Sequence, residues 1–131
     1  MNKKNSAFTM LEVMVVVVVI GILVGIAVPA YMTAVERSRA SKAVNNLKAL
    51  QSAQNHYFSA AETYTNQLVL LGAEVGADFV AMDNSDTDWA YSVPAVAVTT
   101  FTLQATRTGG PHNTKTLTVT QDDVWGGTYP L

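Results

Sequence analysis

An uninterrupted apolar stretch near the N-terminus dominates the hydrophobic pattern of this chain. No charged residue occurs from Val13 to Val35. About 20 apolar residues are enough for a helix to cross a bilayer, and lipid favours a helix because it offers the backbone no hydrogen-bonding partner. The β-branched run 15–19 would prefer a strand in water, but the length of the stretch predicts a membrane helix.

Proline and glycine give this predicted helix two special features. Pro29 has no N–H to donate to the carbonyl of Gly25, so we expect a kink or local melting near Gly25. Gly21 and Gly25 form a small-xxx-small pair that would let a second helix approach closely. Glycine is common in membrane helices, so this pair by itself is a weak signal.

After the apolar stretch the pattern becomes that of a half-buried helix. Apolar and small residues recur at helical spacing on one face, with polar residues on the other. The apolar positions are Ala40, Ala43, Val44, Leu47, Leu50, Tyr57, Phe58 and Ala61. We therefore expect the helix to leave the membrane and to continue over residues 36–61, packed on the rest of the chain.

The last third of the chain shows the period of two that is typical of strands. Trp89 and Tyr91 alternate with small residues, and the segments 100–106 and 116–120 alternate threonine or glutamine with apolar residues. Turn residues at 109–113 separate the last two segments. The pattern predicts a three-stranded antiparallel meander with its apolar face on the amphipathic helix.

The segment between helix and sheet is the least regular. Within residues 62–88, the run from Leu68 to Leu71 would form one apolar turn bounded by Gly72, and a polar run follows at 83–88. The expected fold class is α+β, with a long N-terminal helix packed on a small antiparallel sheet of about three strands.

Composition and charge limit the possible functions. A chain of 131 residues and 14.0 kDa has room for one small domain plus an anchor. The absence of cysteine excludes a disulfide framework and a cysteine-based zinc or redox site. Beyond Tyr57, two basic residues stand against eight acidic ones. This acidic part would repel a phosphate backbone, so no intrinsic nucleic-acid site is expected.

Residues 6–12, Ser-Ala-Phe-Thr-Met-Leu-Glu, lie directly before the apolar stretch and shortly after the basic residues Lys3 and Lys4. Together with Pro29, this segment resembles the prepilin-type cleavage and methylation motif of the type IV pilin and pseudopilin family. The resemblance implies that a prepilin peptidase cuts between Ala7 and Phe8, and that the new amine of Phe8 is N-methylated. Family members usually carry glycine before the cut, and the similarly small alanine stands there in this chain.

The same resemblance gives Glu12 and Pro29 a role in subunit assembly, as the fifth and twenty-second residues of the mature chain. A carboxylate at the head of an apolar helix costs about 3 kcal/mol if it enters hydrocarbon. By itself, such a residue would also fit snorkelling to the interface or a favourable place at the helix N-terminus. The resemblance implies instead that Glu12 pairs with the Phe8 amine of a neighbouring subunit.

Other candidate sites are weaker. His56 and His112 have no second ligand at metal spacing and are expected to be solvated. The sequence contains no nucleophile elbow, phosphate loop or HExxH motif, so we expect neither enzymatic activity nor a cofactor. Asp83, Asp86 and Asp88 would offer oxygens to calcium, but their spacing does not fit an EF-hand, and a solvated acidic loop is the favoured interpretation.

The C-terminal tail lacks the cysteine pair that is common in the family. We therefore expect Trp125 and Tyr129 to hold the tail by packing on the head, with a bound metal as the alternative.

The resemblance divides the chain into a leader peptide 1–7, a transmembrane and assembly helix 8–35, and a head 36–131 made of the amphipathic helix 36–61, a variable loop 62–88 and the sheet with its tail 89–131. The implied function is that of a structural subunit of a type IV pilus. The alternatives are a pseudopilin of a type II secretion or DNA-uptake system, and a membrane-anchored binding module.

The implied partners are further copies of the chain in a helical homopolymer, prepilin peptidase, an inner-membrane assembly platform with its ATPase, and membrane lipid before assembly. The implied location is the inner membrane for the single-pass precursor, followed by an extracellular pilus or a periplasmic pseudopilus.

Overall fold

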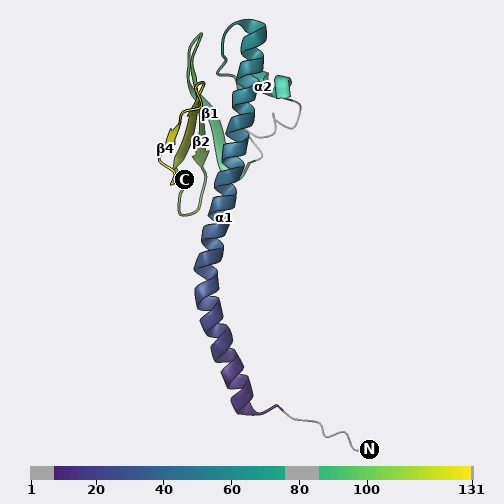
Figure 1. Cartoon of the computed structure of the whole chain (residues 1–131), viewed down its shortest axis with the longest axis vertical. Helices are drawn as coiled ribbons and strands as arrows, with labels where there is room; N and C mark the ends of the chain where they lie inside the picture. Colours follow the sequence, from purple (N-terminus) through teal and green to yellow (C-terminus); the bar gives the residue numbers. More distant parts are fainter. Residues whose placement is uncertain (1–7, 76–85, 131) are drawn as a thin grey trace, which may run out of the picture. The chain divides into compact units, whose positions relative to one another are not determined.

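The computed structural model describes residues 8–75 and 86–130. The elements in chain order are α1 (Met10–Ala61), α2 (Leu68–Val75), β1 (Trp89–Val96), β2 (Phe101–Arg107), β3 (Thr116–Thr120) and β4 (Trp125–Gly127), as drawn in Figure 1. The chain divides into two compact units, Met1–Ser38 and Arg39–Leu131, and α1 contributes residues to both.

In its described part, the first unit consists almost entirely of the apolar half of α1. Pro29 lies inside this helix, and the residues around it are all helical. The local melting expected near Gly25 is therefore wrong for this structure. Proline removes one bond of the helical ladder, and the bonds on either side keep the conformation. The hydroxyl of Thr33 donates to the carbonyl of Pro29 at 3.0 Å.

The second unit contains one antiparallel sheet in the order β1-β2-β3-β4. β2 and β3 pair in regular register, with Leu103 opposite Val119. The pairing of β1 with β2 is irregular between Ser92 and Ala95, around Pro94, which has no N–H for the ladder. The predicted α+β class, a long helix with an antiparallel sheet, is confirmed.

The sequence pattern does not predict the fourth strand. In β4, Trp125 pairs with Val119 and Gly127 pairs with Leu117. Glycine is uncommon in strands, so the two glycines of β4 give no strand signal in the sequence. Gly127 has a φ of 118°, and a Cβ there would collide with the carbonyl of Thr116. The close approach of β4 to β3 therefore requires glycine.

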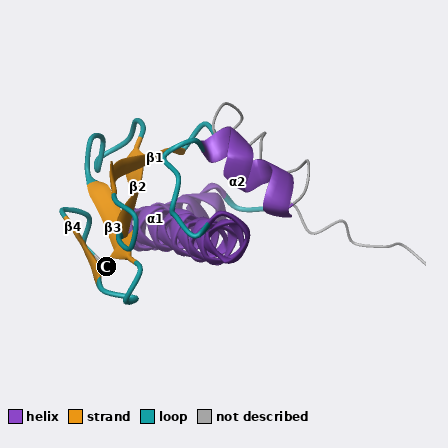
Figure 2. Cartoon of the chain, turned by 90° about the horizontal axis from the view of Figure 1, so that it is seen from above, coloured by secondary structure: helices purple, strands orange, loops and turns teal. Residues whose placement is uncertain are grey.

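The core of the second unit lies between α1 and the inner face of the sheet. Alternate side chains of β2 and β3 are buried, and α1 presents small and aliphatic residues at helical spacing. Figure 2 shows the sheet along one side of α1 and α2 on another. The buried apolar residues are Ala43, Leu47, Leu50, Ala53, Leu71, Trp89, Tyr91, Phe101, Leu103, Ala105, Leu117, Val119 and Tyr129.

The connection from α1 to the sheet begins with a buried amide pair. Gln54 is fully buried, and its Nε2 donates to the carbonyl of Thr65 at 2.6 Å. Its Oε1 accepts from the N–H of Thr65 at 3.1 Å. Further on, α2 is longer than the single turn expected, because Gly72 is buried inside the helix and does not end it.

Candidate functional site

The described chain starts with two non-helical residues, Phe8 and Thr9. Thr9 caps α1, because its Oγ1 accepts a hydrogen bond from the N–H of Glu12 at 3.2 Å. Its carbonyl accepts a backbone hydrogen bond from Val13 at 3.3 Å. Threonine suits this place because its side-chain oxygen satisfies an N–H of the first turn that has no helical acceptor. The cap therefore defines where α1 begins.

The apolar half of α1 is exposed. From Met10 to Met32, its large apolar side chains keep between 47% (Val16) and 78% (Met10) of their area accessible. By length and composition α1 could cross a membrane, and none of its most apolar stretch is buried. An exposed apolar surface of this extent is not expected to face water, and lipid or other apolar helices are surroundings that would suit it.

The predicted assembly residues lie along this surface without meeting one another. Glu12 lies in the first turn of α1, and Phe8 and Glu12 are both exposed. Pro29 follows Glu12 by 17 residues, a rise of about 26 Å in a helix. Ala7 lies outside the described residues. A contact between the two ends of this segment would therefore need two copies of the chain.

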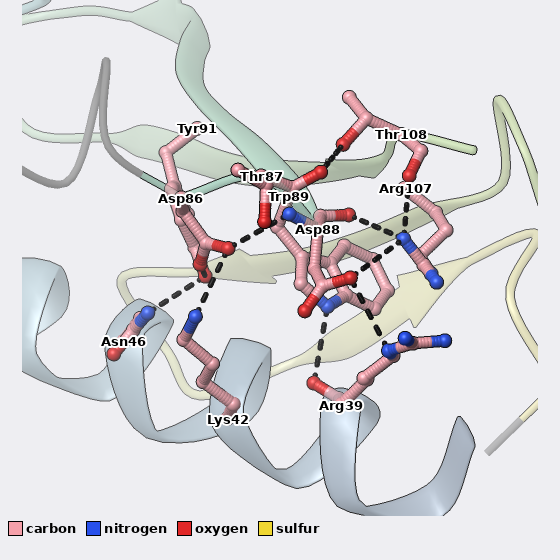
Figure 3. Close-up of polar contacts among 10 residues, drawn as sticks. All are labelled: Arg39, Lys42, Asn46, Asp86, Thr87, Asp88, Trp89, Tyr91, Arg107 and Thr108. Atoms are coloured by element: carbon pink, nitrogen blue, oxygen red, sulfur yellow. Dashed lines mark hydrogen bonds and ion pairs between the residues drawn. The ribbon is translucent and has the colours of Figure 1, made fainter. Parts of the chain in front are cut away.

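A polar network joins α1 to the start of β1 in the second unit (Figure 3). Asp86 Oδ1 accepts hydrogen bonds from Lys42 Nζ and from the N–H of Asp88, both at 3.0 Å. Its Oδ2 accepts from the hydroxyl of Tyr91 at 3.2 Å. That hydroxyl itself accepts from Asn46 at 2.7 Å. The Asp86 carboxylate thus links the part of α1 around Lys42 to the start of the sheet.

The protonation of this network is fixed by its contacts. The Asp86 side chain is 3% exposed. Burial by itself raises its pKa, but the hydrogen bond from Asp88 and the contact with Lys42 outweigh burial and hold the pKa of Asp86 below its usual value. Burial, reinforced by the charge of Asp86, raises the pKa of Tyr91 well above its usual range, against the opposing hydrogen bond from Asn46. Asp86 is therefore an anion and Tyr91 a neutral donor at neutral pH.

Asp88 forms the second half of the network. Its carboxylate lies 3.2 Å from Arg39 Nε and 3.4 Å from Arg107 Nη1. Arg107 is only 2% exposed, and Nη1 also donates to the carbonyls of Asp88 and Thr108. The guanidinium carbon lies 5.9 Å from the ring centroid of Trp89. These acceptors satisfy a cation that would otherwise be costly to bury.

The interpretation of a solvated acidic loop is wrong for Asp86 and Asp88. Their charges are balanced by Lys42 and two arginines, and calcium would have to displace these cations. Lys42 is 44 residues away from Asp86 in sequence, so local sequence could not reveal the pairing. Asp83 lies outside the described residues. Within residues 8–75 and 86–130, no three metal-ligating side chains are grouped together.

The two histidines have different surroundings. His56 is exposed on α1, as expected. His112 is half-buried, and its ring lies 5.0 Å from that of Tyr129 in an edge-on arrangement. His112 thus takes part in covering the C-terminal tail.

Three structurally important residues were not predicted. Thr9 and Glu12 match the capping-box pattern Thr-x-x-Glu, which was visible in the sequence. The structure shows one of the two hydrogen bonds of a capping box, from the N–H of Glu12 to Oγ1 of Thr9. Arg107 lies two positions after Ala105 in β2, so the alternation of inward and outward side chains along the strand indicated that it is buried. Gln54 had no local signal, because its partner lies in the irregular connection after α1.

Two family descriptions match the chain. The prokaryotic N-terminal methylation motif matches residues 2–28. The type IV minor pilin ComP, DNA uptake sequence receptor, matches residues 29–119. The first range includes the segment from Ala7 to Glu12, and the second includes most of the head.

The similarity to curated relatives extends over only part of each chain. The type IV major pilin protein PilA of Myxococcus xanthus is 45% identical over 65 residues, which are 50% of this chain and 30% of PilA. The type II secretion system core protein G of Aeromonas hydrophila is 44% identical over 56 residues, 43% of this chain and 39% of that protein. Fimbrial protein EcpC of Eikenella corrodens is 39% identical over 59 residues, 45% of this chain and 39% of EcpC.

The chain thus spans 30–39% of the length of these relatives. By their names they are subunits of pili and secretion systems, and none is named as an enzyme. The chain has a methylation motif at its N-terminus and a long helix on an antiparallel sheet, and the minor pilin model matches more than half of its length. The chain therefore belongs to the ComP family of type IV minor pilins.

Proposed function

We propose that this chain is a structural subunit of a type IV pilus, made as an inner-membrane precursor and polymerised through α1 after removal of residues 1–7. The observation that carries the proposal is the exposed apolar half of α1, most of which lies within residues 2–28, the range that matches the N-terminal methylation motif. Such a surface suits lipid before assembly and neighbouring apolar helices afterwards. A simple membrane anchor would explain the helix but not the motif.

Glu12 gives the apolar helix a means of setting register. Its carboxylate is the one acidic group between Met1 and Val35. In a bundle of apolar helices it needs a positive partner, and the amine created at Phe8 by the cut can supply one from a neighbouring copy. Within one copy, Glu12 comes four positions after Phe8, and its N–H donates to the side chain of Thr9 in the intervening turn.

The processing step is a hydrolysis followed by a methyl transfer. One water adds across the Ala7–Phe8 peptide bond, leaving the carboxyl group on Ala7 and the amine on Phe8. A methyl donor then replaces one N–H of that amine by N–CH₃ with release of a proton. Prepilin peptidase supplies the first step, and an inner-membrane platform with its ATPase would extract the mature subunit into the filament.

The proposal is tested by comparing sheared filaments with membranes from cells that express the chain. We expect the wild type in the filament fraction. Ala7→Leu, which places a bulky side chain before the cut, should leave the subunit in the membrane. A wild-type chain found in membranes alone would support an anchored binding module instead. An Ala7→Leu chain that enters filaments normally would contradict the need for processing.

A role in DNA uptake is a second candidate, because the family that matches residues 29–119 carries that description. The charges of the head give it little support. Arg39, Lys42 and Arg107 are engaged with aspartates. Among the described residues of the second unit, this leaves Lys48 and Lys115 for phosphate contacts, whereas tight binding to DNA uses several.

Fluorescence anisotropy with labelled duplexes decides this second candidate. A receptor should bind one sequence more tightly than a scrambled duplex, and Lys48→Gln or Lys115→Gln should weaken binding. A soluble head that binds no duplex at low salt would contradict a role of the head in DNA binding.

A pseudopilin is the remaining alternative, favoured by the likeness to type II secretion system core protein G. Such a subunit would form a periplasmic pseudopilus and would be missing from filaments sheared from the cell surface.

A further inference from the structure

The first helical residue lies close to the proposed cut. The nitrogen of the bond to be cut belongs to Phe8, which is non-helical and 75% exposed. Thr9 follows as the cap, with its Oγ1 3.2 Å from the N–H of Glu12, and α1 begins at Met10. The proposed cut thus falls just outside α1. A helix that began three residues earlier would include the bond to be cut.

The position of this boundary matters for hydrolysis. In a helix, each carbonyl accepts a hydrogen bond from the N–H four residues later, and the side chains of neighbouring turns surround the backbone. If Ala7 were helical, its carbonyl would accept from the N–H of Leu11. A peptidase would then have to unwind the first turn before water could attack that carbonyl, at a cost in free energy. A bond outside the helix avoids this cost.

The sequence offers competing helix starts upstream. Asn5 and Ser6 are residue types that cap helices at least as well as threonine. With Ser6 as the cap, Ala7 and Phe8 would be the first two helical residues. Neither is a helix breaker, so a specific contact is needed to keep the start at Met10. The hydrogen bond from Glu12 to the side chain of Thr9 is the contact that the structure provides there.

We infer that Thr9 is a positioning residue for processing: by capping α1, it keeps the Ala7–Phe8 bond outside the helix, where prepilin peptidase can hydrolyse it. This role rests on the proposed function, since it presupposes the cut. Thr9 acts through the helix start, and its hydroxyl is not assigned to the reacting atoms. After the cut the same cap leaves the Phe8 amine outside the helix, accessible to methylation.

The test uses the full chain in lipid vesicles with purified prepilin peptidase, and intact mass follows the product. Thr9→Val keeps the shape of the side chain but removes the acceptor. We expect its initial rate of cleavage to fall about fivefold, the factor that corresponds to a helix cap of typical strength. Thr9→Ser and Thr9→Asn restore an acceptor, so both should be cut within about twofold of the wild-type rate.

Thr33→Val is the matched control. It makes the same chemical change on the same helix and removes the bond to the carbonyl of Pro29, but it leaves the helix start intact. It should be cut at the wild-type rate. The ¹³Cα chemical shift of Phe8 in detergent micelles gives an independent readout, and it should move toward helical values in Thr9→Val alone.

The outcomes separate this role from the proposed function. Equal cleavage of the wild type and Thr9→Val would overturn the role of Thr9 and leave the processing itself in place. The role is also overturned if Thr9→Ser is as slow as Thr9→Val, because the hydroxyl is then not the cause. A wild-type chain that is never cut after Ala7 would overturn the proposed processing and this inference together.

Discussion

The rings of Trp89 and Tyr129 lie 5.1 Å apart, centroid to centroid, with an interplanar angle of 57°. Trp89 is fully buried, and its Nε1 donates to the carbonyl of Arg39 on α1 at 3.0 Å. The N–H of Tyr129 donates to the carbonyl of Thr116 at 2.9 Å. The tail of a chain without cysteine is thus held by ring packing and strand pairing. The predicted packing of both tail residues is confirmed: Tyr129 is buried, and Trp125 is half-buried and packs against the core.

Removing the Tyr129 ring should therefore destabilise the head. We expect Tyr129→Ala to lower the free energy of unfolding by about 3 kcal/mol, because a cavity would open against Trp89. Trp125→Ala should cost about 1 kcal/mol, since its ring is half-buried and lies 6.0 Å from Lys48 Nζ. Chemical denaturation of a soluble head starting at Arg37 measures both values. Equal effects of the two variants would show that the ring contact with Trp89 is not what holds the tail.

The stability of the head should depend on acid through Asp86. Its pKa is lower in the folded chain than its ordinary value. The unfolded state therefore binds the proton more readily, and the contribution of Asp86 is complete above the ordinary carboxyl pKa of about 4. It is lost as the pH falls through the lowered value. Asp86→Asn should be less stable than the wild type at pH 7, and the difference should shrink at low pH.

Asp122→Asn is the control for this pH dependence. Asp122 is exposed, and its carboxylate accepts a hydrogen bond from the neighbouring Gln121 at 2.7 Å. The substitution removes one carboxylate from the head without touching the network of Asp86. Unfolding curves between pH 3 and pH 7 compare the three proteins. If Asp122→Asn and Asp86→Asn lost stability equally at pH 7, net charge and not the buried contact would be the cause.

The elements with regular periodicity were predictable from the sequence. The apolar stretch after Glu12 identified the long helix, and the alternation around Tyr91, Leu103 and Leu117 identified the three main strands. In each case the signal lies within one element, because burial of one face imposes its own period on the residues. β4 was missed since Gly126 and Gly127 have no side chains to alternate.

Contacts between distant residues were not predictable in the same way. Asp86 and Asp88 look like residues of a polar loop, and only the fold places Lys42 and Arg107 beside them. Their pairing depends on how the start of β1 approaches α1. The cap at Thr9, in contrast, was not predicted although its signal is local, because a capping box is encoded within four residues.

Substitution of Glu12 should separate folding from assembly. Glu12→Ala should insert and fold, since the apolar stretch and the core of the head are unchanged. It should assemble poorly, because the Phe8 amine of a neighbouring copy would be buried without a partner, at a cost of about 3–5 kcal/mol. The ratio of subunit in sheared filaments to subunit in membranes measures the effect in cells where the variant is the sole subunit.

Glu12→Asp and Glu12→Gln refine this test. The first keeps the charge on a shorter side chain and should retain part of the filament yield. The second keeps the shape without the charge and should fail like Glu12→Ala. Normal filament yield from Glu12→Gln would mean that the carboxylate has no role in assembly.

The intact mass of the subunit from sheared filaments tests the whole account most directly. A chain that starts at Phe8 and carries one additional methyl group is the predicted result, since both follow from the motif around Ala7 and Phe8. A filament subunit that still carries residues 1–7 would contradict the assignment of this chain as a processed pilin.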